Sequence, residues 1–333
     1  ADRAIFSHPG EAGCRCSGGR RRAPALARAA VLFHDWLAKR RGAFRGPEIG
    51  ARDRMAFLRC ILPRFLVTAA LGGVVLWAGA VAYLHSERRA LIYPFDRWQT
   101  TATAYAGNGR FETVAAADGT PITVWVSPPA GGRPTLLHFM GNAGVMSRAV
   151  QRFSALAREG YGVVIMNYRG AGGMPGTPSE AAITADALIV RDRIPDLVGP
   201  TPVVVYGTSL GAAVAVKVAA RSPVAGAILA APFARLCETA RHHHAWAPAC
   251  LLLRDERWDS IERIGEIGAP LLVIHGAEDR IVPLSQGRAL RAAAREPKRL
   301  VVIPGAGHRG IGGPLARQEV RAFLEGLTPQ APR

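Results

Sequence analysis

The sequence predicts an α/β fold: a mostly parallel β-sheet with helices on both faces and a short helical cap, preceded by one apolar helix. From about residue 105 onward, segments rich in Val, Ile and Leu alternate with helical patterns, as expected for strands buried on both faces. Residues 203–214 are a β-branched run that ends in Gly-x-Ser-x-Gly and continues at once as a small-residue helix. This pattern is typical of a sharp strand-to-helix turn that presents a serine. Residues 65–84 form a run of 20 residues without a charge, which is long enough for a helix to cross a bilayer.

The first 60 residues are predicted to be an arginine-rich arm without regular structure. Residues 1–64 carry 14 Lys or Arg against five acidic residues, so this fifth of the chain holds a large part of the formal net charge of +17. We find no recognition module and no interleaving of aromatic and basic residues, so no nucleic-acid partner is expected. An arm beside a membrane, attracted to anionic lipid, explains the charge better. Met55 resembles a natural start, and residues 1–54 are hypothesised to be an upstream extension.

The predicted membrane anchor comprises residues 61–85, with the uncharged run at its centre. A cleavable signal peptide and a buried core helix are the alternatives. The run is longer than the apolar region of most signal peptides, although residues 78–82 offer small-residue cleavage sites. Four arginines precede the run: Arg52, Arg54, Arg59 and Arg64. Because cytoplasmic flanks carry the excess of positive charge, we expect a cytoplasmic N-terminus and an extracytoplasmic domain, periplasmic if the protein is bacterial.

A single catalytic-type domain is predicted over residues 100–330. Two short strands, 111–115 and 121–126, are joined across the turn at Asp118-Gly119. Further strands are expected at 135–140, 162–168, 203–206, 224–230, 271–275 and 299–303. Helices are expected at 146–158, 179–193, 284–295 and 314–327, and a further helix follows the strand at 203–206 and runs to 220. Residues 232–268 interrupt the alternation with mostly helical character, and they are the predicted cap.

Ser209 is the candidate nucleophile. Gly207 and Gly211 flank it, as the close approach of strand and helix requires. A serine nucleophile needs a base and a carboxylate that orients the base. In this kind of sheet the acid and then the histidine follow on loops after later strands. Asp279 follows strand 271–275, and His308 follows strand 299–303, so the predicted triad is Ser209, Asp279 and His308. Glu278 remains an alternative for the acid.

The oxyanion hole is predicted to use two backbone amides. One belongs to Leu210, directly after the nucleophile, and the other comes from the loop after the third strand. In that loop Gly141 allows the backbone to turn inward, and Asn142 is the expected donor.

Residues 85–325 resemble membrane-anchored α/β-hydrolase domain proteins of the bud-emergence type, within the serine aminopeptidase-like hydrolases. Six collinear stretches carry the resemblance: HFMGNAG (138–144), NYRGAGGMPGTPSE (167–180), YGTSLG (206–211), APF (231–233), HGAEDRIVP (275–283) and IPGAGH (303–308). The resemblance implies an α/β-hydrolase fold, an N-terminal anchor, the same triad, and ester or thioester hydrolysis. Two positions depart from the family pattern. Met140 replaces a usual histidine beside the oxyanion loop, and Met174 replaces a small polar residue in a loop expected to border the pocket.

Other motifs do not indicate a metal or a cofactor. His242, His243 and His244 are consecutive and would point to different faces of a helix, so no metal site is expected. The glycine-rich loop 170–176 lacks the Lys-Ser/Thr of a phosphate-binding loop, and Arg169 is expected to support it structurally. The five cysteines show no zinc-binding spacing. Cys237 and Cys250 would be able to pair in an oxidising compartment.

The predicted function is a membrane-anchored serine hydrolase that cleaves an ester or thioester through an acyl-enzyme on Ser209. The expected partners are the membrane, through residues 65–84, and a small-molecule or lipid acyl substrate that an apolar wall of the cap, with Trp246 and residues 251–253, would contact. Packing of this cap segment on the core is the alternative. One competing hypothesis is an aminopeptidase-like amidase, which needs acids for a substrate amine; Asp255, Glu256 and Asp259 are the candidates. The other is a non-catalytic binding protein. The oligomeric state is not predicted.

Overall fold

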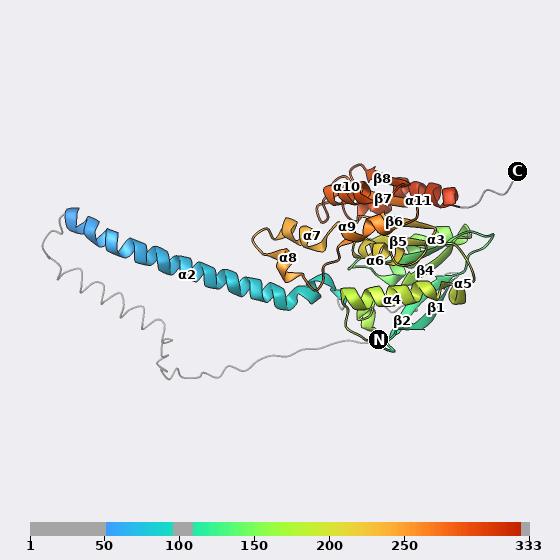
Figure 1. Ribbon diagram of the computed structural model, residues 1–333, viewed down its shortest axis with the longest axis horizontal. Helices are drawn as coiled ribbons and strands as arrows, with labels where there is room; N and C mark the ends of the chain where they lie inside the picture. Colours follow the sequence, from blue (N-terminus) through green and yellow to red (C-terminus); the bar gives the residue numbers. More distant parts are fainter. Residues whose placement is uncertain (1–50, 96–108, 328–333) are drawn as a thin grey trace, which may run out of the picture. The chain divides into compact units, whose positions relative to one another are not determined.

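The computed structural model describes residues 51–95 and 109–327 (Figure 1). Most of the predicted arm, residues 1–50, lies outside the described residues. An eight-stranded sheet runs through the domain in the order β1-β2-β4-β3-β5-β6-β7-β8. Its strands are β1 (Arg110–Ala115), β2 (Pro121–Ser127), β3 (Thr135–Phe139), β4 (Gly162–Met166), β5 (Val203–Thr208), β6 (Gly226–Ala230), β7 (Leu271–Gly276) and β8 (Lys298–Ile303). The pairings β1–β2 and β2–β4 are antiparallel and the others are parallel. The predicted fold class is confirmed.

Helices precede the sheet, cover it, and build the segment between β6 and β7. The long helices are α2 (Ala51–Ile92), α3 (Met146–Arg158), α4 (Glu180–Asp192), α6 (Leu210–Ala219), α10 (Leu284–Ala293) and α11 (Pro314–Leu327). Shorter elements are η3 (Ala171–Gly173), α5 (Ile194–Val198), α7 (Leu236–His243), α8 (Ala249–Leu252), α9 (Ser260–Arg263), η4 (Ile264–Glu266) and η5 (Gly310–Gly312). Ser179 begins α4 because its hydroxyl accepts a hydrogen bond from the amide of Ala182 at 3.2 Å.

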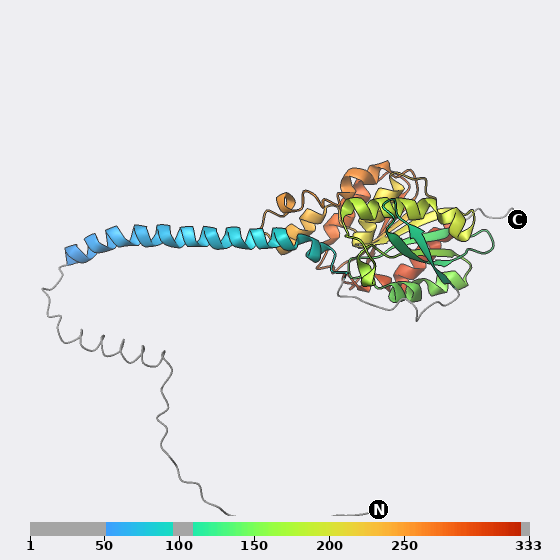
Figure 2. The same cartoon turned by 90° about the horizontal axis from the view of Figure 1, so that it is seen from below.

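The central strands are buried along their whole length because helices cover both faces of the sheet. Every residue of β3, β4 and β6 is buried. Helices α3 and α11 lie on one face, and α4, α6 and α10 lie on the other (Figure 2). Parallel strands place their carboxyl ends at one edge of a sheet, so the loops after β5, β7 and β8 meet there. That edge carries the candidate site.

Helix α2 contains the predicted anchor. Within its segment Ile61–Ile92, the most apolar window of 18 residues has a mean hydropathy of 2.1, and none of that window is buried. This helix is long and apolar enough to be a single-pass membrane anchor. From Val75 onward it belongs to the same compact unit as the sheet, whereas the residues up to Val74 form a separate unit. The helix begins at Ala51, inside the segment predicted as the arm.

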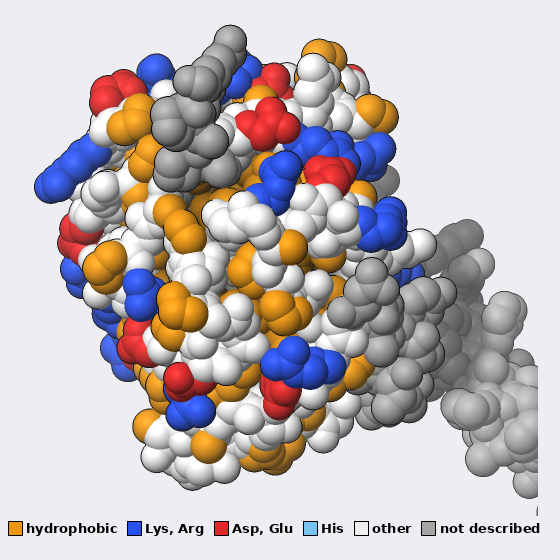
Figure 3. Space-filling model, turned by 90° about the vertical axis from the view of Figure 1, so that its right-hand side faces the viewer, with side chains coloured by type: hydrophobic (Ala, Val, Ile, Leu, Met, Phe, Trp, Pro, Cys, Tyr) orange, Lys and Arg blue, Asp and Glu red, His pale blue; other side chains and the backbone are white. Residues whose placement is uncertain are grey.

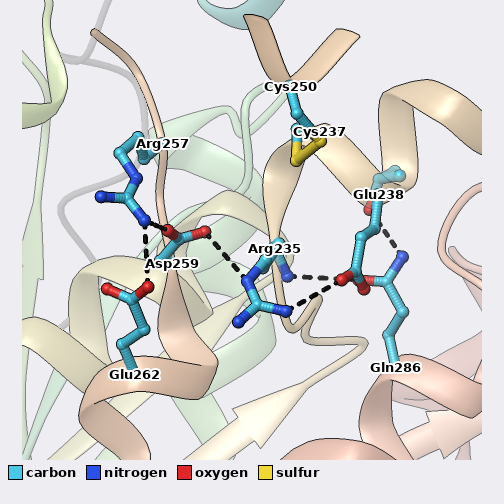
Figure 4. The surroundings of a disulfide bond; sticks show 9 residues. Arg235, Cys237, Glu238, Cys250, Arg257, Asp259, Glu262 and Gln286 are labelled. Atoms are coloured by element: carbon cyan, nitrogen blue, oxygen red, sulfur yellow. Dashed lines mark hydrogen bonds and ion pairs between the residues drawn. A yellow bond between two sulfur atoms is a disulfide. The ribbon is translucent and has the colours of Figure 1, made fainter. Parts of the chain in front are cut away.

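The segment between β6 and β7 corresponds to the predicted cap, and it consists of short helices rather than one continuous helix. A disulfide between Cys237 and Cys250 ties α7 to α8 (Figure 4). The side chain of Gln286, on α10, holds the start of the cap. Its oxygen accepts the amide of Ala234 at 2.9 Å, and its nitrogen donates to the hydroxyl of Thr239 at 3.0 Å. The cap is therefore fixed both within itself and to the helix beneath it.

Arg169 joins three separate parts of the domain. Its guanidinium makes two hydrogen bonds to Asp186 on α4, at 2.7 and 2.6 Å. A third hydrogen bond, of 2.8 Å, goes to Asp118 in the β1–β2 turn. The predicted supporting role for this arginine agrees with these contacts, which hold the loop after β4 between the hairpin and α4.

Charges on the domain surface are mixed in sign. Figure 3 shows one face on which basic and acidic side chains are interspersed with apolar ones. Exposed pairs of this kind include Arg193 with Asp196 at 2.9 Å and Arg321 with Glu159 at 2.6 Å. Each such pair contributes at most about 1 kcal/mol to stability.

Candidate active site

Ser209 occupies the sharp turn between β5 and α6. Its backbone has φ 53° and ψ −115°, a conformation that residues other than glycine rarely adopt. The neighbouring glycines are required by close backbone contacts. A Cβ at position 207 would lie 2.2 Å from the carbonyl oxygen of Gly211, and one at position 211 would lie 2.0 Å from that of Phe139. The strained turn lifts the serine hydroxyl above the edge of the sheet.

The loops after β7 and β8 bring the predicted acid and base to this hydroxyl. His308 Nε2 lies 3.0 Å from Ser209 Oγ, and its Nδ1 lies 2.7 Å from Asp279 Oδ2. The imidazole can therefore accept the serine proton on one nitrogen while it donates to the carboxylate from the other. Asp279 is fully buried at its side chain, whereas 15% of the His308 side chain is exposed.

Asp279 is held as a carboxylate. Its Oδ1 accepts the backbone amides of Ile281 and Val282, both at 2.9 Å. Burial alone would raise the pKa of Asp279, but the hydrogen bonds from His308 and from these two amides outweigh burial and lower it. Glu278, the alternative acid, is exposed. The contact with His308 is made by Asp279.

His275 and Tyr168 support the site, and sequence reasoning did not identify either. His275 is fully buried at the end of β7, donates from Nε2 to the carbonyl of Val282 at 2.9 Å, and lies 3.5 Å from Asp279 Oδ2. Burial lowers its pKa, so it is neutral and fixes the loop that presents amides to Asp279. Tyr168 donates its hydroxyl to the carbonyl of Met140 at 2.7 Å. In the sequence both residues look like ordinary ends of strands.

The loop after β3, in which the oxyanion hole is predicted, passes close to the serine. A Cβ at Gly141 would lie 3.4 Å from Ser209 Cβ, so this backbone passes directly beside the nucleophile. Asn142 and Leu210 line the same cavity as Ser209. Leu210 is the first residue of α6, where an amide has no acceptor within the helix. Met140, where the resemblance expected a histidine, is buried in the core.

Two cavities meet at Ser209 and His308. The larger, which we call the apolar cavity, has a volume of about 450 Å³. One side of it is formed by four residues of α2: Leu84, Arg88, Leu91 and Ile92. Cap residues between 233 and 253 also line it. The remaining lining residues are those at 142–143, 209–210, 281–282 and 308–309. The smaller, which we call the basic cavity, has a volume of about 320 Å³ and includes Arg148, Arg152 and Arg309. No Asp or Glu is among the described residues that line either one.

The acids proposed for an amine-binding site pair with arginines instead. Asp259 contacts Arg235 at 3.7 Å and Arg257 at 2.5 Å (Figure 4). Asp255 lies 3.8 Å from Arg88, and Glu256 lies 3.5 Å from Arg89. None of the three acids lines the apolar cavity, so this cluster does not offer a free carboxylate to a substrate amine.

The remaining predicted positions are also accounted for. His243 contacts the carbonyl of Ile281 at 2.9 Å through Nε2, and both His243 and His244 line the apolar cavity. That the three histidines bind no metal stays a prediction. Met174 packs against Thr123, whose hydroxyl lies 3.3 Å from its sulfur, and it lines neither described cavity.

The pKa of His138, which lies on β3 at the basic cavity, predicts how the stability of the protein depends on pH. Burial and the nearby charge of Arg152 lower the pKa of His138 to about 3. Below its usual pKa of about 6.5, the unfolded chain binds a proton that the folded chain excludes, so the free energy of unfolding falls by up to about 1.4 kcal/mol per pH unit as the pH decreases. A His138→Leu variant in detergent should show a shallower slope when urea unfolding is followed from pH 7 to 5. Equal slopes would contradict this assignment.

Residues 133–260 match the family model described as "Serine aminopeptidase, S33". A relative in Mycobacterium tuberculosis, described as uncharacterised, is 38% identical over 278 residues, which cover 81% of this chain and 97% of that protein. The uncharacterised protein YfhR of Escherichia coli is 31% identical, and the alignment covers 72% of this chain and 86% of YfhR. The lysophosphatidylserine lipase ABHD12 of Danio rerio is 31% identical over 55% of this chain and 58% of the lipase.

Solved structures with the same architecture include two hydrolases. Est1E from Butyrivibrio proteoclasticus has a TM-score of 0.56 at 18% identity and covers 66% of this chain and 98% of its own. A structure described as a bacterial membrane phospholipase A has a TM-score of 0.52 at 19% identity and covers 81% of this chain and 99% of its own. At such low identity these likenesses establish the fold alone.

Proposed function

The chain belongs to the serine aminopeptidase S33 family of α/β-hydrolases, and from this premise we propose that it is a membrane-anchored serine hydrolase that cleaves acyl esters or thioesters. The observation that carries the proposal is the relay from Ser209 through His308 to Asp279, placed at the mouth of an apolar cavity. Within the family, the bud-emergence group, with its N-terminal anchor, is the subgroup that we propose.

The proposed reaction proceeds in two halves. Ser209 Oγ attacks the carbonyl carbon while His308 Nε2 takes the hydroxyl proton, and Asp279 stabilises the imidazolium that results. The oxyanion of the tetrahedral intermediate accepts the amides of Leu210 and Asn142, each of which contributes on the order of 3 kcal/mol. His308 then passes its proton to the leaving alcohol or thiol, and the acyl group stays on Ser209. Water, deprotonated by the same histidine, releases the acid.

An ester is favoured over an amide of an amino acid because the cap acids are occupied by arginines, and because the apolar cavity suits a hydrocarbon chain better than an ammonium group. The similarity to a protein named lysophosphatidylserine lipase is in keeping with an acyl-lipid substrate.

Labelling with a fluorophosphonate probe tests the proposal, together with a panel of p-nitrophenyl esters of increasing chain length and aminoacyl anilides. We expect one adduct on Ser209, absent in Ser209→Ala, and turnover of esters but not of anilides. A folded wild-type protein that forms no Ser209-dependent adduct would overturn the enzymatic reading and leave a binding protein. Faster turnover of anilides than of esters would favour the amidase.

The basic cavity favours an anionic group on the substrate. Arg148, Arg152 and Arg309 have no ion pair with a carboxylate in the described chain. We expect Arg148→Gln/Arg309→Gln to lower kcat/KM for a monoacyl glycerophosphate by about tenfold, since the loss of two charged hydrogen bonds costs about 1.4 kcal/mol or more. The neutral monoacylglycerol of the same chain should change by less than about twofold. Arg221→Gln, which removes an exposed arginine outside both cavities, is the matched control.

We further propose that the domain lies in an oxidising compartment outside the cytoplasm. The disulfide between Cys237 and Cys250 supports this location, since such bonds are rare in reducing compartments. The arginines before the anchor favour the same orientation. A phosphatase fused after residue 327 of the full chain should be active in cells and a galactosidase at the same point inactive; the opposite pair of results would reverse the orientation.

A further inference from the structure

The end of the anchor helix forms one side of the apolar cavity. Leu84, Arg88, Leu91 and Ile92 all line it. These residues lie on one helix face because their spacings of four, three and one keep successive side chains within about a third of a turn. Leu84 and Arg88 are half-buried and Ile92 is buried, whereas Leu91 is 55% exposed and Tyr83, which does not line the cavity, is 65% exposed. This face of α2 therefore belongs to the cavity.

Polar contacts fix the end of α2 against the cap. Directly after the helix, the hydroxyl of Tyr93 donates to the buried carboxylate of Glu256 and accepts the indole N–H of Trp258 at 2.9 Å. About two helical turns before Leu84, Trp77 donates its indole N–H to the carbonyl of Trp246 at 3.0 Å. The contacts on both sides of the cavity wall hold Leu84 and Leu91 in place.

The cavity wall begins where the uncharged run ends. A bilayer core of about 30 Å takes about 20 helical residues, and the uncharged run of residues 65–84 has that length. Leu84 is its last residue and the first that lines the cavity. With residues 65–84 placed in the bilayer core, the cavity begins where that core ends.

From this placement, and on the basis of the proposed acyl hydrolysis, we propose that the end of α2 is the membrane-side wall of the acyl site. The acyl chain of the substrate passes from the bilayer along the Leu84–Leu91 face into the cavity between α2 and the cap, with its carbonyl at Ser209. The anchor is then part of the substrate site, and the side chains at 84 and 91 determine the length of chain accepted. Each buried methylene of the substrate contributes about 0.8 kcal/mol to binding. A bulkier side chain in this wall therefore weakens the binding of long acyl chains but not of short ones.

The test compares Leu84→Trp and Leu91→Trp with Tyr83→Trp in the full chain, purified in detergent. Tyr83 lies on the same helix but does not line the cavity, so it controls for the added indole. For each protein we would measure kcat/KM for p-nitrophenyl butyrate and palmitate, and the rate of fluorophosphonate labelling of Ser209. The cavity-wall variants should lose about tenfold or more with palmitate and less than about twofold with butyrate, because only the longer chain reaches the wall. Leu84→Ala should extend the preference to longer chains.

The outcomes separate the acyl site from the proposed reaction. If wild type and all variants neither label nor hydrolyse any ester, the proposed function fails. If they label and hydrolyse butyrate but palmitate turnover is the same in all four proteins, the wall is not part of the acyl site. Equal losses with both esters in the wall variants, together with slow labelling, would show a distorted active site and would likewise overturn the proposal, unless Leu84→Ala still shifts the chain-length profile.

Discussion

Replacing His308 with glutamine should lower kcat for p-nitrophenyl butyrate by roughly 10⁴-fold or more, since no other base among the described residues hydrogen-bonds to Ser209 Oγ. Its Nε2 lies 3.0 Å from Ser209 Oγ, and its Nδ1 lies 2.7 Å from Asp279. Glutamine can occupy the space but cannot take up the proton. Initial rates of p-nitrophenolate release, at protein concentrations high enough to see the residual activity, provide the measurement.

The two acids give matched variants for the same relay. Asp279→Asn should also cost about 10⁴-fold, because the amide oxygen stays with the two backbone amides and the NH2 group then donates to His308 Nδ1, which imposes the wrong tautomer. Glu278→Gln, one residue away but exposed, should keep activity within about twofold. Circular dichroism and the melting temperature control for folding. Full activity of Asp279→Asn, or a loss of activity only in Glu278→Gln, would show that Asp279 is not the acid that orients His308.

Asp186→Ala should destabilise the domain by about 3 kcal/mol or more, because it leaves the guanidinium of Arg169 without its buried partner. The Arg169 and Asp186 side chains are 8% and 1% exposed. For a domain of this size, the melting temperature should fall by roughly 6–12 °C. Differential scanning fluorimetry of the full chain in detergent would measure it.

Asp118→Ala is the control for this ion-pair network. Asp118 contacts the same guanidinium, at 2.8 Å, but its side chain is 55% exposed. A solvent-exposed partner contributes little to stability because water and salt screen its charge, so the shift in melting temperature should be much smaller. Similar shifts in the two variants would mean that burial of the Arg169–Asp186 pair is not what stabilises the domain.

Much of the fold was predictable because its signals are local. The hydrophobic periods of residues 146–158 and 314–327 predict the two helices with the bounds that the structure has. The β-branched run before Ser209 and the two glycines around it predict the turn, since both act over a few residues. The cap was predicted as a mostly helical segment, but the bounds of its separate helices were not. Its short helices depend on contacts such as Gln286 with Ala234, which join segments far apart in the chain.

The candidate site was predictable in its order but not in its surroundings. Asp279 and His308 follow β7 and β8, which lie on the same side of β5 in the sheet, so the order of motifs along the chain was sufficient to place an acid and a histidine on these loops but not to choose Asp279 over Glu278. His275 and Tyr168 could not be selected in that way. Each donates a hydrogen bond to a backbone carbonyl, His275 to that of Val282 and Tyr168 to that of Met140. Every residue has a backbone carbonyl, so the sequence does not show which one is the acceptor.

The sequence by itself determined the strand-turn-helix that carries Ser209, the later loops that carry an acid and a histidine, and an uncharged run long enough for a membrane. Only the tertiary structure decided that Asp279 rather than Glu278 contacts His308, and that Leu84 and Leu91 of the anchor helix line the cavity at the serine. The physical reason is the separation along the chain over which each interaction acts. Periodicity and turn chemistry act between neighbours in the chain, whereas a cavity forms between side chains whose distances depend on the order and twist of the whole sheet.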